Sequence, residues 1–164
     1  MIELPERLFC TEIAEGDVIA ADMFRRKFHS DPPTDPHHLF VMYRGDDGFV
    51  PVAYSHFAPF GDICLVGGSC TDGLAFSHMS PEERTAIRQL DGVYYSLLRY
   101  GFERFDEDFT AFFGYCGDPR ALEVDLRAGF ETTEHDKLIK LFPREVHPNI
   151  ERALIAKAHA LGPF

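Results

Sequence analysis

The sequence lacks the cysteine spacing that would indicate a zinc site or a disulfide framework. Its four cysteines are scattered along the chain, and no two of them form a C-x-x-C pair. They are Cys10, Cys64, Cys70 and Cys116. We therefore expect reduced, mostly buried thiols, as in a cytoplasmic protein, and no bound metal.

Long hydrophobic runs are also missing. No stretch approaches the ~18–20 consecutive apolar residues of a membrane span. The N-terminal MIELPERLFCTEIAEGD has no basic region followed by an apolar one, which a signal peptide would have. We expect a cytoplasmic protein without a membrane partner.

Positive charge is scarce. The chain has 16 Lys and Arg against 27 Asp and Glu, a formal net charge of −11 at pH 7, and a pI near 5.1. Such a protein repels nucleic acid and anionic membranes, so we expect neither as a partner. The only basic cluster is Arg25-Arg26-Lys27, which is short and typical of a solvated helix face.

What the chain does contain is enough apolar material for a core. Hydrophobic residues make up 45% of it, including 16 Phe, which argues against disorder. A chain of 164 residues buries roughly 70% of its unfolded surface on folding. We therefore expect residues 1–164 to form a single domain.

The first half of the chain predicts one helix and then three strands with hairpin-type connections. Apolar residues recur at helical spacing in the first segment, and β-prone runs flank Gly/Asp turns in the others. A proline-rich loop over Ser30–His38 separates them, and we place His37 and His38 on the surface because no third metal ligand accompanies them. The expected elements are a helix over Glu15–His29 and strands over Leu39–Tyr43, Phe49–Phe57 and Ile63–Cys70.

The second half alternates helices with strands. Ser80, Pro81 and Glu83 have the pattern of a capping box with proline at the first helical position, which predicts the start of a long helix. The expected elements are helices over Ser80–Phe102, within Gly117–Glu131 and over Asn149–Leu161, and strands over Phe109–Cys116 and Asp136–Phe142. This order predicts a mixed α/β (α+β) domain in which Ile63–Cys70 and Phe109–Cys116 are parallel neighbours.

The segment DPRALEVDLRAGF, residues 118–130, resembles a helix of the GNAT superfamily of acyltransferases. Many members have the pattern N-x-x-A-x-x-L-Y-x-K-x-G-F after their fifth strand. The matching positions are Asp118, Ala121, Val124, Arg127, Gly129 and Phe130. Gly129 can adopt the left-handed conformation that ends a helix, and Phe130 then packs at the start of the next strand.

The order of elements from Leu39 to Phe142 is similar to the same superfamily. The resemblance implies a mixed sheet flanked by helices, here with an extra C-terminal helix. It also implies transfer of an acyl group from acetyl-CoA to a small amine or to an N-terminus. The partner would then be a small-molecule acyl acceptor, and a homodimer stays open.

The glycine pair Gly67-Gly68 lies inside an expected strand, where glycine often marks a bulge or a close backbone approach. In the superfamily, the backbone amides of a bulge at this place bind acetyl-CoA, which lies where the fourth and fifth strands splay apart. The resemblance therefore implies a set of cofactor-binding residues. They are Val66, Gly67, Gly68, Thr71, Gly73, Asp118 and Ala121.

Two departures mark the chain as a divergent member with a degenerate pyrophosphate loop. The superfamily has Q/R-x-x-G-x-G/A directly before the long helix, whereas CTDGLAFSHMSPEER precedes the expected helix here, with Glu82 and Glu83 in its first turn. Asp125 stands where the superfamily often has a tyrosine general acid, and we expect it to be exposed in mid-helix. The alternative is a GNAT-like domain that does not bind CoA and serves as a ligand-binding or interaction module.

Two residues are candidates for catalysis. His56 could take a proton from the amine as a general base, or it could be a hydrogen-bonded strand histidine without a catalytic role. Tyr115 could donate a proton to the leaving thiolate, or it could be a core aromatic residue with its hydroxyl at the rim. The sequence alone leaves these alternatives open.

Overall fold

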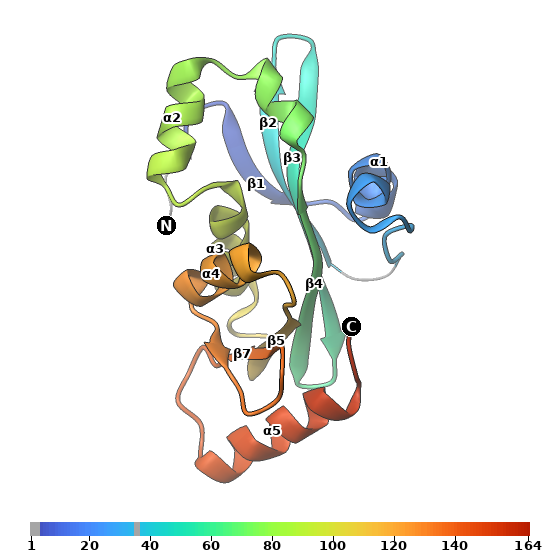
Figure 1. Cartoon of the computed structure of the whole chain (residues 1–164), viewed down its shortest axis with the longest axis vertical. Helices are drawn as coiled ribbons and strands as arrows, with labels where there is room; N and C mark the ends of the chain where they lie inside the picture. Colours follow the sequence, from blue (N-terminus) through green and yellow to red (C-terminus); the bar gives the residue numbers. More distant parts are fainter. Residues whose placement is uncertain (1–3, 35–36) are drawn as a thin grey trace.

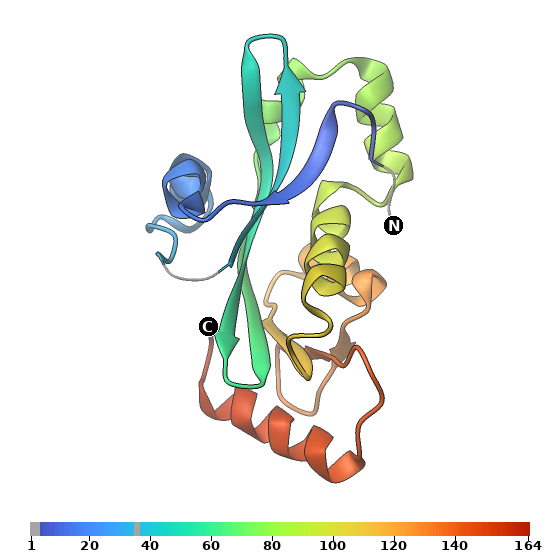
Figure 2. The same ribbon diagram turned by 180° about the vertical axis from the view of Figure 1, so that it is seen from behind.

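Residues 4–34 and 37–164, which the computed structural model describes, form a seven-stranded sheet with helices on both faces (Figure 1, Figure 2). The spatial order of the strands is β1-β2-β3-β4-β5-β7-β6. The strands are β1 (Leu8–Glu12), β2 (His37–Gly45), β3 (Gly48–Phe60), β4 (Ile63–Thr71), β5 (Ala111–Tyr115), β6 (Glu131–Thr132) and β7 (Leu138–Leu141). The helices are α1 (Gly16–Phe28), a 3-10 helix η1 (Gly73–His78), α2 (Pro81–Gln89), α3 (Val93–Phe105), α4 (Pro119–Ala128) and α5 (Pro148–Ala160).

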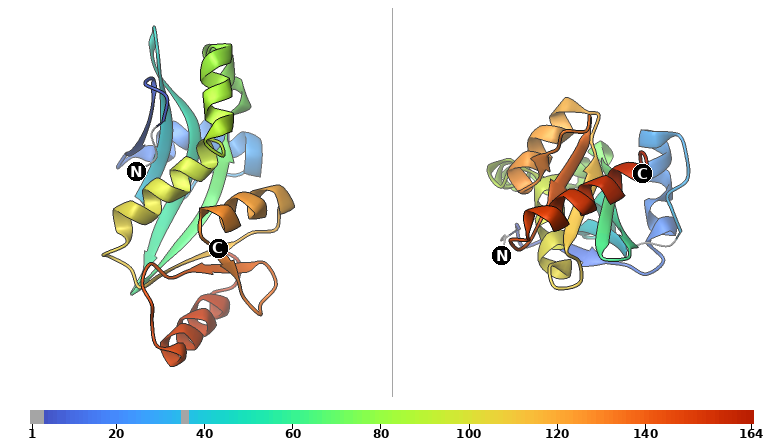
Figure 3. Two further views of the ribbon diagram at one scale, coloured as in Figure 1. Left: turned by 90° about the vertical axis from the view of Figure 1, so that its left-hand side faces the viewer. Right: turned by 90° about the horizontal axis from the view of Figure 1, so that it is seen from below.

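The sheet is antiparallel except for its centre, where β4 and β5 pair in parallel from Ile63↔Ala111 to Val66↔Gly114. This confirms the predicted mixed sheet and its parallel pair. The chain between the two strands includes α3, which lies on the face of the sheet opposite α1 (Figure 3).

Three apolar clusters hold these layers together. On one face α3 lies so close to β3 that a Cβ at Gly101 would be 2.3 Å from the ring of Phe57. On the other face Met23 and Phe24 of α1 pack on Tyr54. The C-terminal helix α5 covers the end of the sheet, as Figure 1 shows, through Leu154, Ile155 and Ala158. Among the residues described, no helix combines the length and apolar character needed to cross a bilayer.

The prediction of one long helix over Ser80–Phe102 was wrong. The capping box exists, with Glu83 N donating to Ser80 Oγ at 3.2 Å and Ser80 N to Glu83 Oε2 at 2.8 Å, but it begins α2. The chain then turns through Asp91 (φ 63°) and Gly92 (φ 91°) before α3 begins. Asp and Gly tolerate positive φ, and an Asp-Gly pair is a turn signal that interrupts helical spacing.

The first strand, β1, was missed, and the placement of two histidines was wrong. The second strand extends back to His37, because His37 and His38 pair with Phe57 and His56 of β3. His38 is only 1% exposed, and its Nδ1 lies 2.8 Å from the hydroxyl of Tyr54. His37 is half-buried, with Nδ1 2.5 Å from the carboxylate of Glu12. Neither histidine is the freely exposed surface residue that the sequence predicted.

Candidate functional site

Strand β4 carries a bulge at the predicted glycine pair. Tyr54 pairs with Cys70 and His56 with Gly67, so Ser55 alone faces both Gly68 and Ser69. Gly68 has φ +58°, and a Cβ there would lie 2.6 Å from Nδ1 of His56. Glycine is therefore required at this position, because a side chain would meet both backbone strain and a steric clash.

A cavity of about 250 Å³ opens where β4 and β5 stop pairing. The bulge forms one wall, and the end of β5 with the start of α4 forms another. The last turn of α1 and the first turn of α3 contribute one or two residues each. Six residues predicted for the site line this cavity: Val66, Gly67, Gly68, Tyr115, Asp118 and Ala121.

Two predicted cofactor-binding residues, Thr71 and Gly73, lie outside this cavity. They line a neighbouring hollow of about 300 Å³ between α1 and η1, which shares Lys27 with the cavity. Of strand β4, only Val66–Ser69 lines the cavity, and the bulge lies at the end of this segment. Thr71 and Gly73 lie beyond it.

His56 lies on β3 directly beside the bulge, with its ring against Gly67 and Gly68, but it does not line the cavity. Burial, with a smaller contribution from nearby His38, lowers the pKa of His56 to about 4. Its Nδ1 is buried and has no hydrogen-bond partner in the part of the chain described. His56 is therefore neutral at physiological pH.

Tyr115, at the end of β5, does line the cavity. Its ring packs edge-on against Phe164 at 5.1 Å between centroids. Its hydroxyl lies 3.4 Å from Nδ1 of His159 on α5. Tyr115 is thus oriented by the C-terminal part of the chain.

Asp125 is buried, not exposed as predicted. It is 3% exposed, and the hydroxyl of Tyr94 donates a hydrogen bond to its Oδ1 at 2.6 Å. Burial raises the pKa of the Asp125 carboxyl, against the opposing effect of hydrogen bonds from Tyr94 and Cys116. No Lys, Arg or His among the described residues forms an ion pair with it.

Sequence reasoning missed Asp125 although a signal existed. It follows Ala121 by four positions and precedes Ala128 by three, so it shares their face of α4. That face turns toward α3 and the cavity. Tyr94 was missed because it fell inside the single long helix that was predicted.

The sequence placed the pyrophosphate loop before the helix that begins at Ser80, which is α2. No residue of α2 lines the cavity, whereas Tyr94 in the first turn of α3 does. The segment before α3 reads QLDGVY, residues 89–94, which matches the first four positions of Q/R-x-x-G-x-G/A. Gly92 caps α3 without a side-chain hydrogen bond, and the first turn of α3 has no acidic residue.

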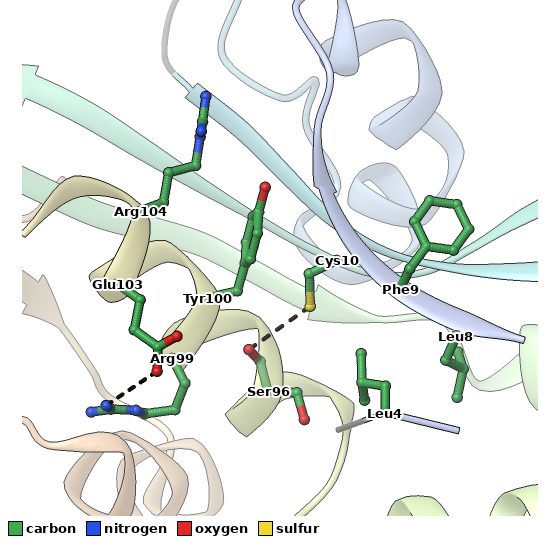
Figure 4. Close-up of a pocket in the computed structure, with 9 residues that line it drawn as sticks. All are labelled: Leu4, Leu8, Phe9, Cys10, Ser96, Arg99, Tyr100, Glu103 and Arg104. Atoms are coloured by element: carbon green, nitrogen blue, oxygen red, sulfur yellow. Dashed lines mark hydrogen bonds and ion pairs between the residues drawn. The ribbon is translucent and has the colours of Figure 1, made fainter. Parts of the chain in front are cut away.

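A larger cavity, of about 550 Å³, lies between β1 and α3 (Figure 4). Leu4, Leu8 and Cys10 line it on one side. Its charged residues are paired, Arg99 with Glu103 and Arg104 with Glu12. It shares no lining residue with the cavity at the bulge, so it is not part of the candidate site. No group of three or more His, Cys, Asp or Glu within 4–34 and 37–164 could hold a metal ion.

No protein-family model and no curated protein sequence matches this chain. Several solved structures do. The ribosomal-protein-S18-alanine N-acetyltransferase of Escherichia coli is 11% identical, with a TM-score of 0.58 over 87% of this chain and 97% of that one. A GNAT family acetyltransferase of Brucella melitensis in complex with acetyl-CoA is 13% identical, with a TM-score of 0.54 over 88% and 93%.

A third similar structure is the N-acetylglutamate synthase of Neisseria gonorrhoeae complexed with coenzyme A and L-arginine. It is 8% identical, with a TM-score of 0.54 over 84% of this chain and 34% of that one. At these identities the comparison defines the fold. The chain has the GNAT acyl-CoA N-acyltransferase fold, as the sequence resemblance implied.

Proposed function

We propose that the protein is an acetyl-CoA-dependent N-acyltransferase whose site is the cavity at the bulge of β4. The observation that carries the proposal is the bulge at Gly68, located where the parallel strands β4 and β5 stop pairing in a GNAT fold. Two similar structures contain coenzyme A or acetyl-CoA, which supports the choice of cofactor.

The start of α3 suits an anionic group better than the start of α2 does. A helix N-terminus presents unpaired N–H groups and a positive dipole end. Glu82 and Glu83 place negative charge on α2, whereas α3 has none in its first turn. Glu82 and Glu83 would therefore repel cofactor phosphates at the start of α2, whereas the first turn of α3 contains no acidic residue. We propose that the first turn of α3, where Tyr94 lines the cavity, faces the phosphates, with Val66, Gly67, Gly68, Asp118 and Ala121 along the cavity.

Acetyl-CoA, when bound, would supply the acyl group as a thioester. Asp125 would hold the proton that a leaving thiolate needs, because burial favours the neutral carboxyl and the side chain lines the cavity. Tyr115 remains a second candidate for this role. His56 is the predicted base for the amine, but it does not line the cavity, and its low pKa makes it a weak base.

The direct test is an assay of acyl transfer. The protein is incubated with acetyl-CoA and a panel of small amines and short peptides, and release of free thiol is followed. We expect thiol release that depends on one class of amine and falls on replacing Asp125 with Asn. If acetyl-CoA neither binds at millimolar concentration nor is turned over, the proposal fails and the alternative of a CoA-free binding module takes its place.

A further inference from the structure

The last turn of α1 contains three consecutive basic residues, and only two of them are paired. Arg25 lies 2.6 Å from Asp31, and Arg26 lies 2.8 Å from Asp72. Lys27 is exposed and has no ion-pair partner in the described part of the chain. A helix C-terminus favours basic residues in general, which accounts for the cluster but not for the unpaired state of its third member.

Lys27 supplies the positive charge in the lining of the cavity at the bulge. It is the one Lys or Arg among the described residues that line it, in a protein of net charge −11. The two carboxyl groups there are already engaged. Asp118 caps α4 by accepting a hydrogen bond from Arg120 N at 2.9 Å, and Asp125 accepts one from Tyr94. The charge of Lys27 is therefore free to meet a ligand.

The surroundings of Lys27 strengthen such a contact. The next residue, Phe28, lines the same cavity with 39% of its surface exposed, and Val66 and Phe130 add apolar walls. Attraction between opposite charges grows as water is excluded from between them. An anionic group at the α1 rim would thus meet both a cation and an apolar wall.

We propose that the acyl acceptor is a small amine that carries a carboxylate, held by Lys27 while its amine reaches the bulge of β4. This inference rests on the proposed function and narrows it. A free amino acid has the required anionic group, whereas the N-terminus of a peptide carries an amide in its place. The acceptor is therefore a free amino acid or a similar amine, not a protein N-terminus.

The test compares amino acids with their own carboxamides, which differ only in the anionic group. Direct binding is measured by calorimetry without cofactor, and kcat/KM is measured with acetyl-CoA. We expect the preferred acid to exceed its amide by about fivefold or more, the size of one partly desolvated ion pair. Lys27→Met should reduce the ratio to near one, mainly through KM, whereas Lys27→Arg should retain it.

Arg25→Met is the matched control, since Arg25 lies in the same turn and does not line the cavity. It should leave the acid-to-amide ratio unchanged. Lys27→Met should also leave the affinity for acetyl-CoA unchanged. If instead acetyl-CoA binding falls in Lys27→Met, the anion at Lys27 belongs to the cofactor and the inference is wrong.

Two further results would overturn the inference. Amides could be bound and used as well as acids, or no acid could bind or be acylated while acetyl-CoA does bind. The second result leaves the proposed function standing. Absence of acetyl-CoA binding overturns the proposed function instead, and the cofactor-free titration of acid against amide then still decides the role of Lys27.

Discussion

At the residue scale, Asp125 makes the clearest prediction about pH. Its pKa is raised in the folded protein, so the buried carboxyl stabilises the fold while protonated, and this contribution is lost as pH rises through the folded pKa. Asp125→Asn keeps an oxygen for Tyr94 but cannot ionise. We expect its stability relative to wild type to increase as pH rises from about 4, the unfolded pKa, through the raised pKa of the folded protein.

Urea unfolding of both proteins at several pH values tests this. Whereas the stability of Asp125→Asn should rise relative to wild type, its acyl-transfer activity should fall. We expect a loss of about 10²-fold or more in kcat if the carboxyl donates a proton. A stability difference that is constant with pH would contradict the raised pKa. Unchanged kcat would assign the proton to another group, with Tyr115 next to be tested through Tyr115→Phe.

His56 makes the opposite prediction at acid pH. Its pKa falls from 6.5 to about 4 on folding, so the unfolded chain takes up the proton first. The stability that neutral His56 contributes is complete above pH 6.5 and is lost as pH falls toward 4. We expect His56→Gln to lose less stability than wild type between these values. Equal acid sensitivity of the two proteins would show that His56 is not the buried neutral residue described here.

Gly68 is the residue of the bulge at which we expect any substitution to destabilise the protein. The backbone at Gly68 does not admit a side chain, because φ is +58° and both His56 and Phe24 lie within 2.7 Å of a Cβ built there. We expect even Gly68→Ala to lower the free energy of unfolding by about 1–3 kcal/mol.

Gly73 provides the matched control, because nothing lies within 4 Å of a Cβ there and its φ is not left-handed. Gly73→Ala should change stability by less than about 0.5 kcal/mol. Equal effects of the two substitutions, measured by urea unfolding, would mean that the bulge does not require glycine.

At the element scale, the break between α2 and α3 changes which acidic residue we expect to weaken acetyl-CoA binding. Glu82 lies in the first turn of α2, and no residue of α2 lines the cavity. Asp91 directly precedes the cap of α3 and is paired with Arg127. We expect Asp91→Asn to strengthen binding by ~0.3–1 kcal/mol at low ionic strength, with no effect of Glu82→Gln.

Calorimetric titration of both variants decides between the two helix starts. Asn tolerates the positive φ of Asp91, so the backbone should be preserved. If Glu82→Gln is the variant that binds more tightly, the phosphates lie at α2 and our correction is mistaken.

The helices and strands differ in whether they could be predicted from the sequence. The capping box, the bulge at Gly68 and the helix stop at Gly129 were predictable because each depends on neighbours in the chain. The strand β1 was not, since its place in the sheet depends on pairing with β2, a segment distant in the sequence. The break at Asp91-Gly92 was visible as a turn signal, but the apolar spacing from Ile87 to Gly101 masked it.

In the candidate site, too, the features that depend on neighbours in the chain were predictable, and those that depend on packing between distant segments were not. The residues near the bulge were identified from local motifs, and Asp118 and Ala121 from the helix that resembles the superfamily. Tyr94, Asp125 and Lys27 come together only when α3, α4 and α1 pack around the end of β5. No spacing within one segment brings these three side chains to one cavity, although the Ala121–Ala128 face marked Asp125 as buried.

At the scale of the whole molecule, the central claim is that the gap between β4 and β5 receives acetyl-CoA. Ala121 lines that gap from α4, and a larger side chain there would fill it from a helix surface rather than from the core. Ala156 is exposed on α5 and does not line the cavity, so it allows a control of the same size.

Calorimetric titration with acetyl-CoA of wild type, Ala121→Phe and Ala156→Phe is the measurement that tests this claim most directly. We predict saturable binding by wild type and Ala156→Phe, and an affinity lower by at least about tenfold in Ala121→Phe, equivalent to ~1.4 kcal/mol. Equal binding by all three proteins would place the cofactor elsewhere, and no binding by wild type at millimolar acetyl-CoA would contradict the account.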